Sequence, residues 1–149
     1  SGTDVIIGGE ISKPLNDSLG FIGARANIKG FLCEYMTSGR VLVLGDPGPW
    51  MCAGMTGGVL YLRLQPHLNF DQAAIQRRLG KGAKVSVQEV GESDQQNLRE
   101  LLTMYADELK HNHQAEESQK ALDLLVDWKS TFVRVVPLGQ QEEQKFATE

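Results

Sequence analysis

The 149-residue sequence has few cysteines, no long apolar run and no cluster of basic residues. Its two cysteines, Cys33 and Cys52, are too few for a disulfide framework, and we expect both to be reduced, buried and inert. The longest apolar runs, such as 41–44 and 59–62, fall far short of the roughly 20 residues that span a bilayer. The net charge is −4. We therefore expect no membrane partner and no nucleic-acid partner.

The sequence also lacks the motifs that mark common classes of enzyme. It has no nucleophile elbow, no phosphate-binding loop and no dinucleotide fingerprint. The segment 54–58 is rich in glycine, but it lacks the lysine and the following helix that a phosphate-binding loop needs. We predict no catalytic, cofactor-binding or metal-binding residue in this chain, and no cofactor. Whether the chain is one component of a larger enzyme stays open.

The first residues lack the features that would direct the chain to another compartment. The sequence starts at Ser1 and Gly2 without a methionine, and no signal peptide is visible. We expect this start to be processed, tagged or cut from a longer chain. We also expect a cytoplasmic location.

The strongest pattern that is present is a repeat with a period of 19 residues. Residues of like chemistry align between its two copies: Phe31 with Trp50, Cys33 with Cys52, Met36 with Met55, Val41 with Leu60 and Val43 with Leu62. A weaker third copy aligns Ser18, Gly20 and Ile22 with Thr37, Gly39 and Val41. A fixed period near 20 residues, with like residues superimposed, is typical of a solenoid.

The repeat and its β-rich content predict a mainly β fold, a parallel β-helix with coils of about 19 residues. A left-handed β-helix of the acyltransferase type is the alternative. That fold needs a hexapeptide rhythm and coils of about 18 residues, and the sequence shows no sixfold pattern.

Composition divides the chain near residue 64. The first 64 residues hold twelve of the sixteen glycines and ten charged residues, and the remainder holds four glycines and twenty-four charged residues. We predict β-helix coils over 1–64, an α-helical appendage over 65–138 and a disordered tail over 139–149. The elements expected in chain order are a strand at 4–11, a helix at 70–79 capped by Asn69, a strand at 84–90, a helical hairpin that starts at a Ser93–Gln96 capping box and turns at 111–114, and a last strand over 132–136.

Glu34 is the most unusual charged residue of the repeat, because its counterpart in the next copy is Ala53. We expect a buried structural pair with Arg25 or Arg40 rather than a catalytic role. Phe31 and Trp50 are expected to stack along the solenoid, with a ligand platform as the alternative.

Three histidines and two methionines have simple structural interpretations. His111 and His113 are two residues apart, so a helix would place them on different faces, and we interpret them as solvated turn residues. His67 follows a proline and is interpreted as a loop residue. Met36 and Met55 are expected to pack in the core.

The runs 33–45 (CEYMTSGRVLVLG) and 53–58 (AGMTGG) resemble the C-terminal GXGXG domain of the glutamate synthase large subunit. The similarity is specific over 33–62 and continues more loosely through the helical part. Fewer residues precede these runs than in that family, and Glu116-Glu117-Ser118 replaces the usual Thr-Gly-Ser. We therefore expect either a divergent stand-alone relative or a fragment.

The resemblance implies a right-handed parallel β-helix with a structural role and no catalytic residue. The implied function is a structural or assembly domain of a glutamate-synthase-type complex, a glutamine-dependent oxidoreductase. Its implied partners are the amidotransferase and synthase subunits or domains of that complex. We also expect a homo-oligomer, since a short solenoid leaves an open end. The alternative function is a stand-alone β-helix module that binds a small molecule or a protein partner.

Overall fold

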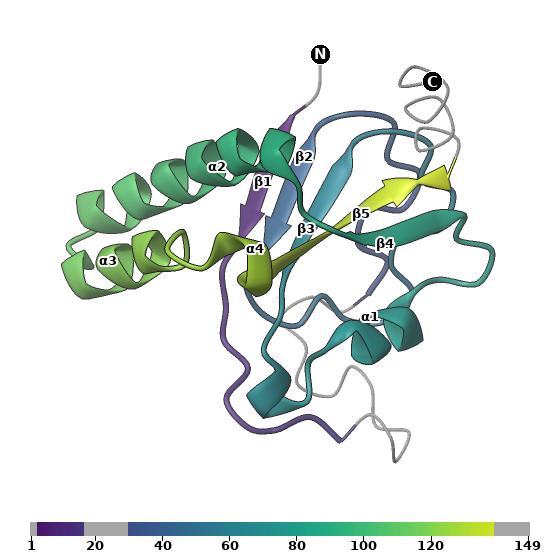
Figure 1. The fold of residues 1–149 in the computed structure, drawn as a ribbon, viewed down its shortest axis with the longest axis horizontal. Coiled ribbons are helices and arrows are strands. Elements are labelled where there is room, and N and C mark those ends of the chain that lie inside the picture. Colours follow the sequence, from purple (N-terminus) through teal and green to yellow (C-terminus); the bar gives the residue numbers. More distant parts are fainter. Residues whose placement is uncertain (1–2, 17–29, 139–149) are drawn as a thin grey trace.

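The computed structural model describes residues 3–16 and 30–138, and its centre is one five-stranded sheet (Figure 1). The strands are β1 (Asp4–Ile7), β2 (Arg40–Val43), β3 (Val59–Arg63), β4 (Val85–Glu89) and β5 (Phe132–Pro137). The helices are α1 (Gln72–Arg78), α2 (Glu92–His111), α3 (Ala115–Asp123) and α4 (Trp128–Thr131), with a 3₁₀ turn, η2 (Pro66–Leu68). The strand order is β1-β2-β3-β5-β4. The fold is therefore a small α/β domain.

The 19-residue repeat appears directly in the register of two strands. β2 and β3 are parallel neighbours, and Val41 lies beside Leu60 while Val43 lies beside Leu62. Both pairs were predicted from the sequence, so the register is confirmed. The strand on the other side of β2 is β1, in which Val5 pairs with Val41. The weak third copy at 18–22 lies outside the described residues.

The prediction of a mainly β parallel β-helix is wrong. The sheet is mixed, because β5 pairs antiparallel with both β3 and β4. A solenoid would continue with a parallel coil on β3, and that position is taken by a strand from the end of the chain. Four helices also belong to the described fold. The division at residue 64 stays a prediction, and the sheet takes strands from both sides of that position.

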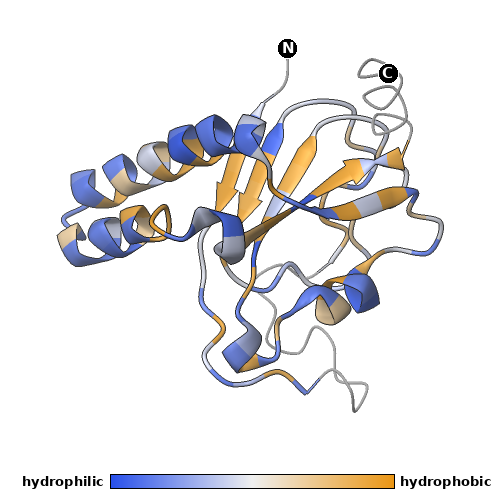
Figure 2. Cartoon of the chain, in the orientation of Figure 1, coloured by the Kyte–Doolittle hydropathy of each residue, from blue (hydrophilic) through white to orange (hydrophobic). Residues whose placement is uncertain are grey.

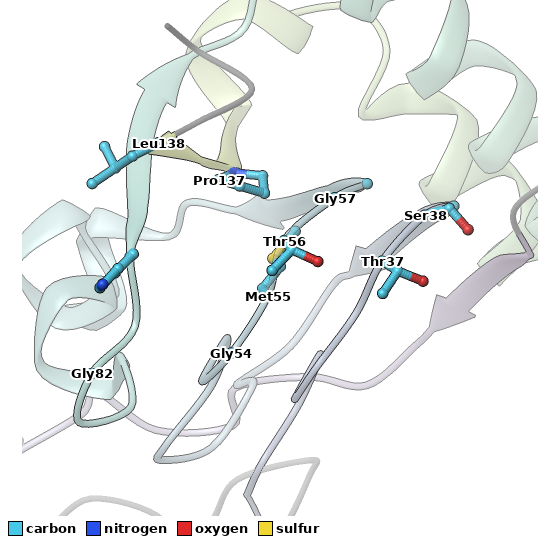
Figure 3. A pocket seen from close by; sticks show the side chains of 12 residues that line it. Thr37, Ser38, Gly54, Met55, Thr56, Gly57, Gly82, Pro137 and Leu138 are labelled. Carbon is cyan, nitrogen blue, oxygen red and sulfur yellow. The ribbon is translucent and has the colours of Figure 1, made fainter. Parts of the chain in front are cut away.

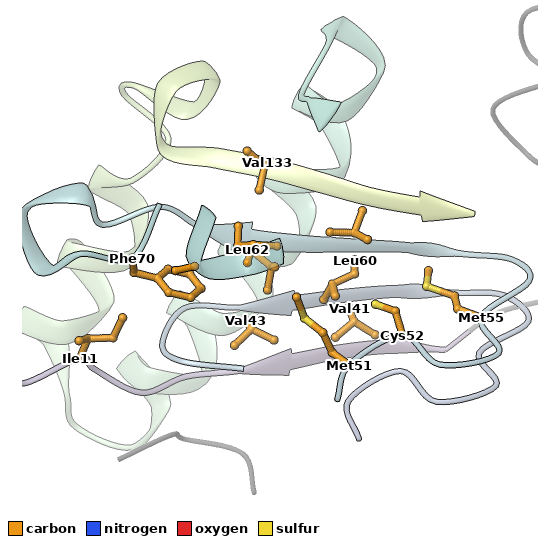
Figure 4. Close-up of a cluster of buried hydrophobic side chains, with 13 residues drawn as sticks. Ile11, Val41, Val43, Met51, Cys52, Met55, Leu60, Leu62, Phe70 and Val133 are labelled. Atoms are coloured by element: carbon orange, nitrogen blue, oxygen red, sulfur yellow. The ribbon is translucent and has the colours of Figure 1, made fainter. Parts of the chain in front are cut away.

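Strand residues alternate between two buried faces because successive side chains of a strand point in opposite directions. The first core packs one face of the sheet against the segment 51–55 and α1 (Figure 4). It contains Val41, Val43, Met51, Cys52, Met55, Leu60, Leu62, Phe70, Ile75, Val133 and Val135, among others. The second core packs the other face against α2, through Leu42, Tyr61, Leu98, Leu101, Leu102 and Phe132. The apolar strands are therefore covered on both sides (Figure 2).

The start of α1 differs from the sequence prediction. Asp71, not Asn69, is the N-cap, and its carboxylate accepts a hydrogen bond from the Ala74 N–H at 3.0 Å. Asn69 has a left-handed backbone (φ 65°), and its side chain donates to the Leu15 carbonyl at 2.8 Å. A carboxylate can satisfy an N-terminal helix N–H, so Asp71 suits the cap equally well.

The long helix α2 also begins with a different cap. Its N-cap is Gly91, whose N–H donates to the Asp94 carboxylate at 2.7 Å. The predicted Ser93–Gln96 box is therefore wrong by two residues. The predicted helical hairpin is confirmed, since α2 and α3 pack together and the chain turns between them. Ser118 of α3 closes the pair by donating to the Ala106 carbonyl at 2.7 Å.

The predicted strands at 84–90 and 132–136 correspond to β4 and β5, and that at 4–11 is shorter, ending at Ile7. The predicted disordered tail, 139–149, lies outside the described residues. None of the helices in the described part of the chain is long and apolar enough to span a membrane.

Two polar clusters connect elements that are distant in sequence. The first is a buried ion pair in which Arg78 of α1 donates to both carboxylate oxygens of Asp46, at 2.8 and 2.9 Å. Arg78 also donates to the Ala74 carbonyl and lies over the Phe70 ring. Asp46 in turn accepts from the Gly48 N–H. Because both charged side chains are almost fully buried, this pair attaches the 46–49 turn to α1.

The second cluster runs beneath α2 and touches every strand. Its members are Asp4 (β1), Arg40 (β2), Tyr61 (β3), Gln88 (β4), Arg134 (β5) and, from α2, Asp94, Asn97 and Glu100. The Tyr61 hydroxyl donates to Asp94 at 2.6 Å, and Asn97 donates to that hydroxyl at 2.9 Å. Burial, followed by the Asp94 contact, raises the pKa of Tyr61 above its usual range. The cluster positions α2 over the sheet.

Candidate functional site

The most regular surface of the molecule is formed by two turn segments, 30–39 and 49–58, which precede β2 and β3. They stack through backbone hydrogen bonds at equivalent positions: Phe31 N–H to Pro49 (3.0 Å), Cys52 N–H to Leu32 (2.8 Å), Tyr35 N–H to Ala53 (2.8 Å) and Thr56 N–H to Met36 (2.8 Å). The two copies of the sequence repeat are therefore two segments whose backbones are hydrogen-bonded to each other.

Both turn segments hold a left-handed backbone near φ 60° at three equivalent positions. These are Phe31 (62°), Cys33 (60°) and Tyr35 (58°) in the first segment and Trp50 (59°), Cys52 (67°) and Gly54 (69°) in the second. Left-handed backbone is uncommon for residues other than glycine and is unfavourable for bulky side chains. The surrounding stack of hydrogen bonds must hold these residues in place, and such strain gathers at functional sites.

The strained positions carry exposed aromatic side chains. Phe31 and Trp50 stack with their ring centroids 5.2 Å apart and an interplanar angle of 25°, as predicted. They remain 56% and 53% exposed, and Tyr35 is 71% exposed. We call these three residues the aromatic surface. Exposed aromatic groups of this kind are enriched at protein interfaces.

Glycines allow the two turn segments to approach each other. A Cβ atom on Gly57 would overlap the carbonyl oxygen of Thr37, and one on Gly58 would lie 2.8 Å from the carbonyl oxygen of Gly39. Gly54 faces the ring of Tyr35 in the same way. Side chains at these positions would push the segments apart, so the glycine pattern is required by the stacking itself.

A groove of about 930 Å³ opens beside the second turn segment (Figure 3). One wall is formed by 54–58 together with 37–39, and the opposite wall is formed by Gly82, Lys84, Pro137 and Leu138. Its volume lies in the range of sites that bind small molecules. We call this cavity the groove.

The chemistry of the groove is that of a binding surface. It presents the hydroxyls of Thr37, Ser38 and Thr56, backbone groups of the glycine segment and the ammonium group of Lys84. Among the described residues that line it, there is no carboxylate, histidine or cysteine that could act as a base or nucleophile. Within 3–16 and 30–138, no group of three or more metal-ligating side chains comes together. The prediction that the chain has no catalytic residue stays a prediction.

The two cysteines occupy equivalent places in the two turn segments. Both are free, Cys52 is buried and Cys33 is partly buried. A hydrogen bond between the two thiols lowers the pKa of Cys33 and, with burial, raises the pKa of Cys52. The reduced state stays a prediction, and full burial holds for Cys52 alone.

The prediction of a buried Glu34 is wrong, because this side chain is exposed. Arg40 instead pairs with Asp4 and Glu100, both at 2.7 Å. Arg25, the other suggested partner, lies outside the described residues. The carboxylate of Glu34 therefore belongs to the solvent-facing side of its turn, next to Tyr35.

The histidines and methionines lie where the sequence suggested. His67 is exposed in η2, and His111 and His113 are exposed at the turn between α2 and α3. Met55 is buried in the first core, and Met36 packs against the same core.

Sequence reasoning missed the buried Arg78–Asp46 pair and the groove. The pair had a partial signal, since Arg78 lies one helical turn after Ala74 on the apolar side of α1. The groove had no such signal, because its walls come from four segments that are separated in the sequence.

Comparison with known proteins points to the same family as the resemblance in the sequence. A family model described as the GXGXG motif matches residues 23–138. The glutamate synthase large chain (NADPH) of Bacillus subtilis is 36% identical over 125 residues, which are 77% of this chain and 7% of that protein. The ferredoxin-dependent glutamate synthase of Antithamnion sp. is 32% identical over 114 residues, 73% of this chain and 6% of that protein.

A shorter match of higher identity falls within the same family of relatives. Ferredoxin-dependent glutamate synthase 1 of Arabidopsis thaliana is 50% identical over 50 residues, 30% of this chain and 3% of that protein. The chain thus spans less than a tenth of the length of these relatives. The resemblance noted in the sequence is confirmed. Because the matched residues 23–138 make up more than half of its length, the chain belongs to the GXGXG motif family.

Proposed function

We propose that this chain is a structural or assembly domain of a glutamate-synthase-type complex and supplies no catalytic residue to it. Family membership and the names of the relatives support a role related to glutamate synthase. The chain corresponds to a small part of each relative, so the glutamine and redox chemistry is assigned to other parts of the complex. The complex is placed in the cytoplasm, and the partners of the chain are its amidotransferase and synthase subunits or domains.

The observation that carries this proposal is the aromatic surface. Phe31, Tyr35 and Trp50 are mostly exposed, yet each has a left-handed backbone that costs free energy. An isolated domain would gain little from holding exposed rings in a strained conformation. A protein partner that covers them gains large, rigid apolar contacts with little loss of side-chain entropy. The aromatic surface therefore suits a permanent interface.

The proposal predicts that the aromatic surface controls assembly. In the double variant Phe31→Ser/Trp50→Ser, the chain should bind the purified amidotransferase and synthase proteins of the same organism at least about 100-fold more weakly, since hot-spot aromatics contribute about 2 kcal/mol or more each. Isothermal titration calorimetry measures this change. The wild-type chain alone should hydrolyse no glutamine.

The matched control, Met104→Ser/Val126→Ser, replaces two exposed apolar side chains, one in α2 and one after α3. Met104 is 47% exposed and Val126 is 77% exposed. This control should bind like the wild type. Unchanged affinity of the Phe31/Trp50 variant would contradict the proposed interface. Glutamine hydrolysis by the chain alone would contradict the non-catalytic role.

A further inference from the structure

The groove lies in line with β5, at the position that a longer β5 would occupy. β5 lies between β3 and β4 and ends at Pro137, and the Leu138 N–H donates to the Lys84 carbonyl at 3.1 Å. Beyond Leu138, the residues that precede β3 and those that precede β4 face each other across the groove. Neighbouring strands lie about 4.8 Å apart, so two strands that flank a third are separated by roughly 10 Å. One extended chain fits that width.

The wall of the groove has unused backbone hydrogen-bonding groups, as comparison of the two turn segments shows. In the first segment, the Tyr35 N–H donates to Ala53, and the Met36 carbonyl accepts from Thr56 and Gly57. The equivalent groups in the second segment are the Gly54 N–H and the Met55 carbonyl. Neither makes a hydrogen bond within the described part of the chain, and both residues line the groove.

The second turn segment is already partly covered by a third layer. The Met51 N–H donates to the Arg78 carbonyl at 2.9 Å, and the Gly80 N–H donates to the Met51 carbonyl at 2.7 Å. In the described residues, the backbone hydrogen bonds between this layer and the second segment end at Met51. Within residues 3–16 and 30–138, the open groups at Gly54 and Met55 therefore continue a backbone interface that begins at Met51.

The side chains around the groove restrict what can complete it. Gly54, Gly57 and Gly58 line the groove, and the side on which each lacks a side chain faces the first turn segment. Lys84 is exposed and makes no ion pair among residues 3–16 and 30–138. A ligand with an extended backbone and a carboxylate near Lys84 matches these features.

We propose that the groove binds an extended, acidic peptide segment of a partner protein, which pairs with the Gly54 N–H and the Met55 carbonyl. This is strand addition to an existing backbone edge. The proposal deepens the assembly function and rests on it for the identity of the partner. The peptide site itself is separate from the aromatic surface and can be tested without glutamate synthase subunits.

The first test measures peptide binding by fluorescence polarisation with the full chain. The probe is a fluorescein-labelled octapeptide of alternating serine and valine with one central glutamate, and a second probe has lysine in place of the glutamate. The glutamate probe should bind, and Lys84→Glu should weaken its binding about two- to five-fold, the range of an exposed ion pair. Lys81→Glu, an exposed lysine outside the groove, is the matched control.

A second variant fills the groove. Thr56→Trp should abolish binding of the glutamate probe, whereas Thr103→Trp, at an exposed position of α2, should leave it unchanged. Equal thermal stability of the two variants excludes unfolding as the cause. Binding of the probe that Thr56→Trp does not reduce would overturn the proposal, as would absence of binding at millimolar peptide. Equal binding of the lysine probe would overturn the acidic preference.

Amide hydrogen exchange compares two equivalent amides, one in each turn segment. In the free chain the Tyr35 amide should be protected and the Gly54 amide should exchange freely, because they occupy the same position in the two turn segments. Saturating glutamate probe should slow exchange at Gly54 at least ten-fold and leave Tyr35 unchanged. A Gly54 amide that is already protected in the free chain would show that another part of the chain occupies the groove, and would overturn the proposal.

Discussion

Two regions of this molecule are stabilised by different interactions. One is the pair of stacked turn segments, and the other is the helical half, which consists of α2 and α3 with the sheet face beneath them. The turn segments stack mainly through backbone hydrogen bonds, with glycines at the closest approaches. The helical half is held by side chains, namely the apolar face of α2, the Ser118 contact and the polar cluster beneath α2. The difference shows that a repeat in sequence can specify local backbone pairing without specifying the complete fold.

The two regions also differ in how they tolerate change. A stack of backbones separated only by glycines has no room for an added atom. A helix packed by side chains can adjust rotamers around a small substitution. The three predictions below test the buried Arg78–Asp46 ion pair, this difference in tolerance and the polar cluster beneath α2. They are given in order of decreasing effect on the free energy of unfolding.

The largest effect is expected from Arg78→Ala, which removes the buried ion pair that attaches α1 to the 46–49 turn. Arg78 belongs to α1, and its partner Asp46 lies in the turn after β2. Both side chains are almost fully buried, so removal of the arginine takes a bidentate charged partner from a buried carboxylate. We expect a loss of about 3–5 kcal/mol in the free energy of unfolding, measured by urea denaturation.

The control for this variant is Arg99→Ala, at an exposed position of α2. It should change the unfolding free energy by less than about 0.5 kcal/mol. If Arg78→Ala were as mild as the control, the buried ion pair would contribute nothing to the free energy of unfolding.

The intermediate effect compares one chemical change in the two regions. Gly57→Ala places a methyl group against the Thr37 carbonyl and should cost about 2 kcal/mol through overpacking. Gly91→Ala adds the same methyl group at the N-cap of α2, where the backbone φ is −114° and the nearest atom is 4.0 Å away. It should cost less than about 1 kcal/mol. Thermal melts of the two variants measure the contrast, and equal shifts would contradict it.

The smallest effect is expected from Tyr61→Phe within the polar cluster. This change removes one hydroxyl that donates to Asp94 and accepts from Asn97, while Asp94 keeps its contacts with Arg134 and the Gly91 N–H. We expect a loss of about 1 kcal/mol in urea denaturation.

Tyr105→Phe is the matched control, because no hydrogen bond of the Tyr105 hydroxyl is present in the described part of the chain. A cost for Tyr61→Phe no larger than that of Tyr105→Phe would show that the cluster contributes nothing at this residue.

Sequence patterns predicted the elements that depend on near neighbours. Alternation of apolar residues predicted β4, an apolar run that ends at Pro137 predicted β5, and helical spacing predicted the α2–α3 hairpin. The 19-residue period predicted the pairing of Val41 with Leu60. The caps were misplaced because several residues near each helix start can accept the same hydrogen bonds, and Asp71 and Gly91 with Asp94 were overlooked. Glu34 was misplaced because an alignment of copies carries no information on exposure.

Arg40 illustrates what a sequence pattern cannot select. Its charge implied a carboxylate partner, and the chain offers nineteen acidic residues. The partners are Asp4 and Glu100, which β1 and α2 bring to Arg40 from 36 and 60 residues away. The groove has the same origin, since Gly54 and Lys84 meet only when β5 separates β3 from β4.

The sequence by itself determined the stacked turn segments, their register, the strands around them and the membership of a family, because each of these depends on local pattern or on a fixed spacing. Only the tertiary structure decided that the sheet is mixed, that Arg78 is buried against Asp46 and that a groove with open backbone groups lies beside Gly54. The physical reason is that a period specifies the neighbour at one fixed separation. The pairing of β3 with β5 joins residues about seventy positions apart, and it is selected by burial of both faces of the completed sheet.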